Sequence, residues 1–299
     1  MAKRIHQMTV RQWEASFPND DACKTYLVAN RWPSGVACPR CGNPDVGEHG
    51  TRAFHWQCYQ CSAKGTSYRF SVTVGTIFEN TKYPLREWFR VIHLMLTSKK
   101  GISALQIHRM IGTGSYETAW SMCHRIRAAM IDKDFRKLMG IVEVDETYIG
   151  GDDDNRHFGK KHGKYWREKK IPVVGAVSRK GKVVARVINN CGTETLEHFI
   201  RNTVDTNVSL LATDDHHGYR DLPRSGYRHG AANHSKKKYV VGAVHTNTIE
   251  GFWSLVKRGM IGTYHKVSRK YLPLYIAEFS WRYNHRSEPD IFGCAIRGC

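Results

Sequence analysis

The sequence predicts a large α/β domain that follows a small cysteine-bearing module and a helical domain. Three observations support this prediction. Four cysteines form two CxxC pairs, apolar residues recur at helical spacing from Pro84, and short apolar runs alternate with helical segments from Ile141 onward. At 299 residues the chain is long enough for one large core and one or two smaller modules.

The charge of the chain is strongly positive. Lys and Arg number 46 against 27 Asp and Glu, which gives a formal net charge of +19 at neutral pH. With 41% hydrophobic and 11% aromatic residues the composition is that of a folded protein, so this is not a disordered basic tail. Such a charge favours a polyanionic partner. Nucleic acid is the usual one, because each neutralised phosphate releases counterions. A merely basic enzyme is the alternative.

The amino end carries no apolar segment, and no run approaches the length that crosses a membrane. We therefore expect no membrane partner and a reducing compartment: the cytoplasm, at the nucleoid of a prokaryote, or the nucleus of a eukaryote. Nine cysteines are an odd number, which argues against a disulfide framework. Ordinary packing or surface thiols are expected at the five cysteines outside the pairs: Cys23, Cys123, Cys191, Cys294 and Cys299.

The two CxxC pairs are Cys38 with Cys41 and Cys58 with Cys61, separated by 58 − 41 − 1 = 16 residues. Four thiolates at this spacing converge tetrahedrally on zinc while the intervening segment folds back as a hairpin. The site is closed, with no open position for catalysis. The spacing therefore predicts a structural zinc ribbon, a module that contacts either DNA or protein.

Segments around the cysteine pairs carry weaker signals. Residues 52–57 and 68–72 resemble strands and mix aromatic with basic side chains. That mixture fits contacts to a nucleic-acid backbone, and equally the core of a very small sheet. Residues 8–30 indicate a short amphipathic helical region, whose expected apolar contacts are Trp13, Phe17, Cys23, Tyr26 and Leu27.

Helical spacing begins at Pro84 and continues to Leu96. A second helix is expected over 103–111, followed by a glycine-containing turn over 112–115 and a third helix over 116–130. Two short helices joined by such a turn are typical of a helix-turn-helix, although similar bundles occur in proteins that never bind DNA. The third helix is expected to bury Tyr116, Ala119, Trp120, Cys123, Ile126 and Met130. It would present His124, Arg125 and Arg127 to DNA.

An apolar strand is predicted over 141–149, with acidic residues inside it. Burying a carboxylate in a strand costs a large desolvation free energy, so such a residue is expected to have a specific role. A bound cation is the best compensation for that cost. Asp145 is the expected ligand, and Glu143, two residues earlier on the same face, is its rival. The acidic run over 152–154 is interpreted as a solvated loop.

Further strands are predicted over 171–178, 182–189 and 209–213, with a helix over 195–204 between the last two. Asp214 directly continues the final strand. Carboxylates at strand ends in α/β sheets are where catalytic metals gather, so Asp214 is expected to be a ligand. Asp215 is expected to face outward or to cap the next turn.

The third acidic element is a predicted helix that begins near Asn247. Its apolar face holds Ile249, Phe252, Trp253 and Val256, and its polar stripe holds Asn247, Glu250, Ser254 and Lys257. An ordinary solvated face would look the same. The interval between Asp214 and Glu250 is 250 − 214 − 1 = 35 residues, and Lys257 follows Glu250 by two turns.

Asp145, Asp214 and Glu250 at this spacing resemble the D-D-E signature of transposases and retroviral integrases. The words "VEVDETYIGG", "HTNTIEGFWSLVKRGMIGTYH" and "YLPLYIAEFSWRYNHR" are more specific. Together with the cysteine pairs they resemble insertion-sequence transposases of the ISXO-two-like group, relatives of Merlin elements. The similarity runs from about residue 15 to 287. It implies an α/β RNase H-like catalytic fold, a mixed sheet with flanking helices.

The resemblance implies a DNA transposase that binds element ends and catalyses metal-dependent strand cleavage and strand transfer. Two Mg²⁺ (or Mn²⁺) ions would be held by Asp145, Asp214 and Glu250. Some members of the group carry asparagine at the third place, which makes Asn247 the alternative to Glu250. A carboxylate suits a hard cation better, and the interval favours Glu250. Lys257 would hold a phosphate near the scissile bond.

Double-stranded DNA is the implied partner, both as terminal inverted repeats and as target, and cutting two ends implies a homo-oligomer on DNA. Lys236, Lys237, Lys238 and His245 are further candidates for DNA contact, against the bland interpretations of a solvated run and a helix cap. A pair of Glu278 and Arg282 on the closing helix is expected to be structural. Two alternatives remain, an RNase H-like DNA nuclease or resolvase and a non-catalytic zinc-ribbon regulator derived from a transposase.

The predicted domains are a helical segment over 1–34, a zinc ribbon over 35–80, a helix-turn-helix region over 81–138, an RNase H-like catalytic domain over 139–287 and a tail over 288–299.

Overall fold

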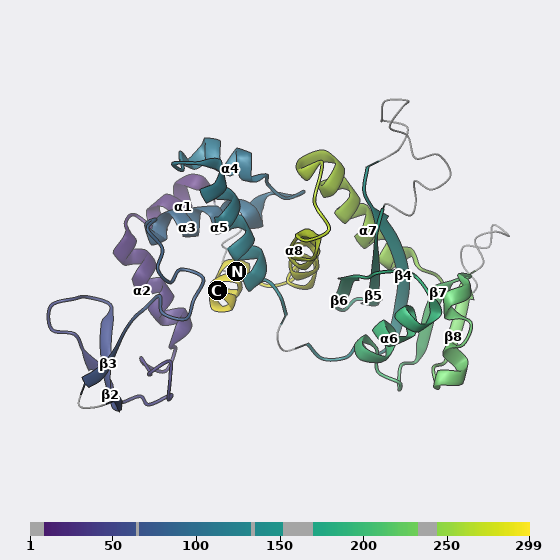
Figure 1. The fold of residues 1–299 in the computed structure, drawn as a ribbon, viewed down its shortest axis with the longest axis horizontal. Helices are drawn as coiled ribbons and strands as arrows, with labels where there is room; N and C mark the ends of the chain where they lie inside the picture. Colours follow the sequence, from purple (N-terminus) through teal and green to yellow (C-terminus); the bar gives the residue numbers. More distant parts are fainter. Residues whose placement is uncertain (1–8, 64–65, 133–134, 152–169, 233–243) are drawn as a thin grey trace. The chain divides into compact units, whose positions relative to one another are not determined.

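The computed structural model describes residues 9–63, 66–132, 135–151, 170–232 and 244–299. The chain forms two compact units (Figure 1). Unit 1 comprises Met1–Met130 together with Ser287–Cys299, and unit 2 comprises Ile131–Arg286. In the described segments no helix has the length and apolarity needed to cross a membrane.

Unit 1 begins with helices α1 (Val10–Ser16) and α2 (Asp20–Arg31). Each has a side-chain cap: Thr9 and Gln12 form a capping box for α1, and the side chain of Asn19 accepts from the backbone N–H of Ala22 for α2. The predicted helical region is therefore confirmed as two helices. Four of its five expected apolar contacts are fully buried, and the fifth is half-buried: Trp13, Phe17, Cys23, Leu27 and Tyr26.

A small antiparallel sheet follows, in the order β1-β2-β3. Its strands are β1 (Gly47–Glu48), β2 (His55–Ala63) and β3 (Thr66–Ser71). The β2–β3 register is regular from His55 to Cys58 and shifts between Cys58 and Ala63, which is the stretch that contains the second CxxC pair. The hairpin expected between the two cysteine pairs is present as the antiparallel strands β1 and β2.

Helices α3 (Leu85–Thr97), α4 (Ala104–Ile111) and α5 (Tyr116–Ala129) follow in the predicted order. Ser103 and Ser115 cap α4 and α5, and α4 ends at Gly112, whose φ of 70° lies in the left-handed region. One expected core residue is wrong. Tyr116 is 44% exposed at the first position of α5, where less of the helix surrounds its side chain.

The last residues of the chain form helix α9 (Ile291–Gly298) rather than the predicted tail. This helix belongs to unit 1, where it contacts α2 and α3. The ring of Phe292 is fully buried among Phe17, Tyr26 and Phe89, with ring centroids 5.5 to 5.9 Å apart. Both ends of the chain therefore build one aromatic core.

Unit 2 contains a five-stranded sheet in the order β6-β5-β4-β7-β8. The strands are β4 (Ile141–Ile149), β5 (Ile171–Ser178), β6 (Val183–Val187), β7 (Leu210–Asp214) and β8 (His229–Ala232). Neighbours among β4, β5 and β6 are antiparallel, whereas β7 joins β4 in parallel and β8 joins β7 in parallel. The first four strands were predicted. Strand β8 was not, because its short HGAA sequence has no apolar alternation.

Helices cover both faces of this sheet (Figure 1). Alternate residues of β4 and β5, such as Val144 and Val174, pack with α6 (Thr193–Thr203) on one face. Val173 and Val177 pack on the other face with α7 (Asn247–Gly259) and α8 (Leu272–Asn284). Shorter elements are two 3₁₀ helices and a π-helical segment that prolongs α7: His217–Tyr219, Leu222–Ser225 and Met260–Tyr264.

Candidate metal centres

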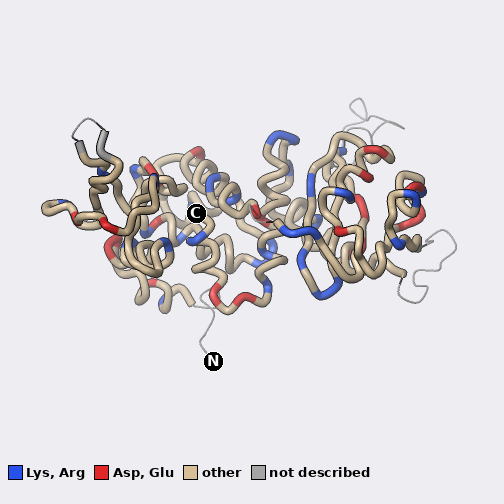
Figure 2. Tube along the Cα trace, turned by 90° about the horizontal axis from the view of Figure 1, so that it is seen from below, with Lys and Arg blue, Asp and Glu red and all other residues tan. Residues whose placement is uncertain are grey.

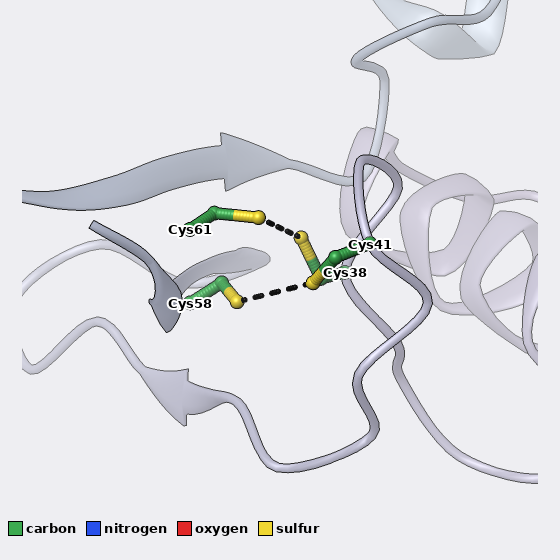
Figure 3. A group of neighbouring side chains, drawn as sticks. All are labelled: Cys38, Cys41, Cys58 and Cys61. Carbon is green, nitrogen blue, oxygen red and sulfur yellow. Dashed lines mark hydrogen bonds between the residues drawn. The ribbon is translucent and has the colours of Figure 1, made fainter. Parts of the chain in front are cut away.

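The four paired cysteines lie together in unit 1, with all their sulfur atoms within 4.8 Å of one another (Figure 3). The Sγ atoms of Cys38 and Cys61 are 3.8 Å apart, and those of Cys41 and Cys58 are 3.7 Å apart. A tetrahedron with Zn–S bonds of about 2.3 Å has edges of about 3.8 Å. The sulfur positions therefore fit a zinc ion held by the four predicted ligands.

The first knuckle is shaped by backbone hydrogen bonds around Cys38. Its carbonyl accepts from the N–H of Gly42 at 2.8 Å, and its own N–H donates to the carbonyl of Asn43 at 2.9 Å. Burial raises the pKa of the Cys38 thiol, but the backbone amides of Cys41 and Arg40 and the neighbouring thiols outweigh it. The pKa falls to about 7. A thiol that ionises readily suits a metal ligand.

In unit 2, the parallel pairing of β4 and β7 puts two predicted carboxylates on neighbouring strands. The last pair of the register is Glu143 with Ala212. Asp145 and Asp214 each lie two residues beyond that pair, and the charge of Asp214 acts on Asp145. Asp214 is half-buried, and its Oδ1 accepts from the backbone N–H of His216 at 3.2 Å. Asp215 is exposed, as expected.

The third predicted element is helix α7, whose two faces are those predicted. Its four apolar residues are at most 3% exposed, whereas its four polar residues are exposed: Ile249, Phe252, Trp253 and Val256, against Asn247, Glu250, Ser254 and Lys257. The Glu250 carboxylate accepts from the Thr246 hydroxyl at 2.8 Å. Helix α7 contacts both β4 and β5, so its first turn lies near the carboxylates of the sheet.

The charges of these acidic groups act on one another. Burial raises the pKa of Asp145, and the charges of Glu146, Asp214 and Glu250 raise it further, to about 7. Among the described residues, however, only the four cysteines have ligand atoms close enough together to bind one metal ion. The carboxylates lie in one neighbourhood, but their oxygen atoms are too far apart for three of them to share an ion in this conformation.

Glu146 is a neighbouring acid that the sequence analysis did not single out. Its Oε2 accepts from the Tyr219 hydroxyl, and its Oε1 lies 3.6 Å from Nδ1 of His216. Burial raises its pKa, and the charge of Asp214 adds to that shift. A second acid directly after Asp145 in a buried strand was the available signal.

Glu143, the rival of Asp145, has a different environment. Its side chain is 0% exposed. Its carboxylate accepts from the guanidinium of Arg179 at 2.7 Å, from the Thr248 hydroxyl at 2.9 Å, and from the backbone N–H groups of Thr248 and Ile249 at 2.7 and 3.1 Å. Nδ1 of His245 lies 3.3 Å from the same carboxylate. Glu143 is thus bound to the start of α7.

The predicted DNA-contacting residues have unequal environments. Arg127 is 1% exposed, so a DNA contact by its side chain is contradicted: it is buried within unit 1. Arg125 is half-buried, with its guanidinium 5.2 Å from the Trp88 ring centroid and a hydrogen bond to the Glu79 carbonyl. Lys257 is exposed. The run Lys236–Lys238 lies outside the described residues. Elsewhere, Lys and Arg are spread along the chain (Figure 2).

Two features indicate the class of protein. One unit contains a zinc ribbon, and the other is an α/β unit with several carboxylates near two parallel strands. Two protein-family models match this chain. The "ISXO2-like transposase domain" matches residues 137–284, and the "Transposase zinc-ribbon domain" matches residues 18–64. The chain belongs to this family of insertion-sequence transposases.

A relative from Halobacterium salinarum is described as an uncharacterized protein in transposable element ISH50. It is 28% identical over 280 residues, which cover 89% of this chain and 92% of the relative. A solved simian T-cell lymphotropic virus intasome in complex with PP2A regulatory subunit B56 gamma gives a match with 14% identity and a TM-score of 0.27. That match covers 58% of this chain and 63% of the viral one. A likeness at this TM-score carries no conclusion about the fold.

Proposed function

We propose that this protein binds the ends of its mobile element and catalyses metal-dependent DNA strand cleavage and strand transfer. The observation that carries the proposal is that Asp145 and Asp214 belong to neighbouring parallel strands, that α7 contacts the first of these strands, and that the charges of Asp214 and Glu250 act on Asp145. Residues 250 − 145 = 105 positions apart in sequence are thus brought into one neighbourhood. Membership of the transposase family supports a role for them in strand chemistry.

The strand order supports an RNase H-like catalytic unit. Three antiparallel strands, β4 to β6, are extended by two parallel strands on the side of β4. Helices lie on both faces of this mixed sheet. This is the arrangement that an RNase H-like domain requires, and it puts the first acidic strand at the centre of the sheet.

The donor set fits a hard divalent cation such as Mg²⁺ or Mn²⁺. Asp145, Asp214 and Glu250 supply carboxylate oxygens, which such ions prefer. Burial and the neighbouring negative charges raise the pKa of Asp145, and a bound cation would stabilise its ionised form. When bound, such ions polarise a phosphodiester and lower the pKa of an attacking hydroxyl. Asn247 lies one turn before Glu250 on the exposed face of α7, within reach of the same neighbourhood.

Binding of the DNA is assigned to positively charged residues. Lys257 is exposed two turns after Glu250, and we assign it to a DNA phosphate as a point charge. The net charge of +19 supports binding to double-stranded DNA at the element ends and at the target. The helix pair α4 and α5 and the zinc ribbon are the modules we assign to end recognition. Two ends must be cut, so we expect a homo-oligomer on DNA.

A strand-cleavage and strand-transfer assay on DNA that carries the element's own ends tests the proposal. Asp145→Asn and Asp214→Asn should each abolish cleavage in Mg²⁺ while end binding persists. Asp215→Asn is the matched control, because Asp215 is the exposed neighbour of Asp214 and should leave cleavage intact. Cleavage retained by either of the first two variants would contradict the assignment. Hydrolysis without joined products in the wild type would indicate a nuclease or resolvase.

The third ligand is decided by a second pair of variants. Glu250→Gln should remove metal-dependent cleavage, whereas Asn247→Ala should weaken it by a smaller factor. The reverse order would make Asn247 the ligand and Glu250 a neighbour. Both side chains are exposed on α7, so neither change should unfold the helix.

A further inference from the structure

The carboxylate of Glu143 has all four of its acceptor positions occupied. Oε1 accepts from Nε of Arg179 and from the Thr248 hydroxyl, and Oε2 accepts from the backbone N–H groups of Thr248 and Ile249. A carboxylate has about four lone-pair sites, so none remains for a cation. The Glu143 side chain is also 0% exposed, so Glu143 is not available as a second metal ligand beside Asp145.

The backbone donors come from the open end of a helix. Thr248 and Ile249 are the second and third residues of α7, whose first amides have no partner inside the helix. The residue before α7, Thr246, makes no side-chain capping bond. Glu143 supplies that cap from another strand, and its negative charge is favourable at the positive end of the helix. A cap from outside ties the helix to the strand that provides it.

The two sides of this contact both carry predicted metal ligands. Glu143 lies on β4, two residues before Asp145 and on the same face of the strand. Helix α7 carries Glu250, one residue after Ile249. Building on the proposed function, we propose that Glu143 is a positioning residue: it holds the start of α7 against β4 and thereby sets Glu250 relative to Asp145.

Arg179 and His245 complete the arrangement. Arg179 follows β5 and donates to the backbone carbonyl of His245 at 3.2 Å as well as to Glu143. Its guanidinium compensates the buried carboxylate, whose charge would otherwise be costly. Arg179 thereby joins the end of β5 to the segment that leads into α7. Nδ1 of His245 lies beside the same carboxylate, and the DNA contact of His245 stays a prediction.

The test uses the full-length protein and metal alone. Mn²⁺ binding is measured by calorimetric titration for the wild type, Glu143→Ala, Glu143→Gln and Asp145→Asn. Amide hydrogen exchange is followed at Thr248 and Ile249 in the same proteins. Ile200→Ala is the control for general destabilisation, since Ile200 is fully buried on the opposite face of the sheet from α7.

We expect Glu143→Ala to weaken Mn²⁺ binding by about 10- to 100-fold, as loss of an outer partner of metal ligands does. Exchange at Thr248 and Ile249 should become faster in the same variant. Glu143→Gln keeps an oxygen for the two amides, so its Mn²⁺ affinity should fall between those of Glu143→Ala and the wild type. Asp145→Asn should lose Mn²⁺ binding with both amides still protected. Ile200→Ala should retain wild-type Mn²⁺ affinity.

Three results would overturn the inference. Wild-type Mn²⁺ affinity in Glu143→Ala would show that the contact does not position the site. Complete loss of binding in Glu143→Gln, with Thr248 and Ile249 still protected, would make Glu143 a ligand. Absence of Mn²⁺ binding by the wild type itself would overturn the proposed function and this inference with it, a failure distinct from the other two.

Discussion

The indole of Trp253 lies so close to the backbone of Gly175 that a Cβ atom on this glycine would stand 2.6 Å from the ring. Gly175 is the cross-strand partner of Asp145 on β5, and Trp253 belongs to the buried face of α7. The missing side chain therefore lets the helix approach the sheet at the level of the acidic cluster. This contact and the cap by Glu143 both join α7 to the sheet.

Gly175→Ala should push α7 away from the sheet. The new methyl group would also meet Cδ1 of Ile249 at 3.1 Å, and overpacking of this kind costs about 1–3 kcal/mol. We expect lower stability in urea unfolding and reduced strand cleavage. Gly251→Ala is the matched control on α7, because a Cβ there has nothing within 4 Å; it should be neutral or stabilising by about 0.5–1 kcal/mol. Equal behaviour of the two variants would contradict the prediction.

Asp145→Asn should stabilise the metal-free protein at neutral pH. Burial and neighbouring charges raise the pKa of Asp145 from 3.8 to about 7, so the folded state holds this proton more tightly than the unfolded chain. The wild type therefore loses stability as pH rises from about 4 to 7, by on the order of 4 kcal/mol once the loss is complete.

The difference between Asp145→Asn and the wild type should thus vanish below pH 4 and be largest above pH 7, as measured by urea unfolding with a chelator present. Asp215→Asn, at an exposed position, should change stability by less than about 0.5 kcal/mol at any pH. A variant less stable than the wild type at pH 8 would refute this account of the acidic cluster.

Removal of zinc should unfold the ribbon locally. The sheet β1-β2-β3 is small, and a zinc ion bound by the four cysteines would join β2 to the segment that carries Cys38 and Cys41. Cys41→Ser should lose zinc, measured by elemental analysis, and should make residues 38–71 sensitive to protease. Cys191→Ser lies in unit 2 and should keep the wild-type zinc content. Full zinc content in Cys41→Ser would show that the four-cysteine site is wrong.

Loss of the last helix should destabilise unit 1. Phe292→Ala removes a fully buried ring packed on Phe17 and Phe89, a change that costs about 3–5 kcal/mol. Phe292→Leu should cost less, because it leaves a smaller cavity. Proteolysis of residues 10–130 should accelerate in the order wild type, leucine, alanine. No difference among the three would mean that α9 does not complete the aromatic core.

Several elements were predictable because their signal is local. The CxxC spacing of Cys38, Cys41, Cys58 and Cys61 specifies a tetrahedral site whatever the rest of the chain does. The apolar and polar faces of α7 follow from a period of 3.6 residues, and the strands around Asp145 and Asp214 follow from their apolar runs. The two matching family models confirmed the family that the sequence motifs had indicated.

Other features had no local signal. Strand β8 forms because β7 offers it a free edge, and its HGAA sequence does not announce a strand. Arg127 looked like an exposed residue on a recognition helix, yet it is buried in unit 1. The final residues looked like a tail because their partners, Phe17 and Phe89, lie about 200 or more positions earlier in the chain.

The four-cysteine module, the helices and strands that have a periodic pattern, and the family were determined by the sequence alone, since each depends on local spacing or on specific sequence motifs. Only the tertiary structure gives the two acids near the centre of β4 different surroundings. The sequence favours Asp145 over Glu143 as a ligand, but both are acids on one face of one strand and their surroundings are not written in it. The open end of α7 reaches Glu143 and donates two backbone hydrogen bonds to its carboxylate, whereas burial and the charges of Glu146, Asp214 and Glu250 raise the pKa of Asp145.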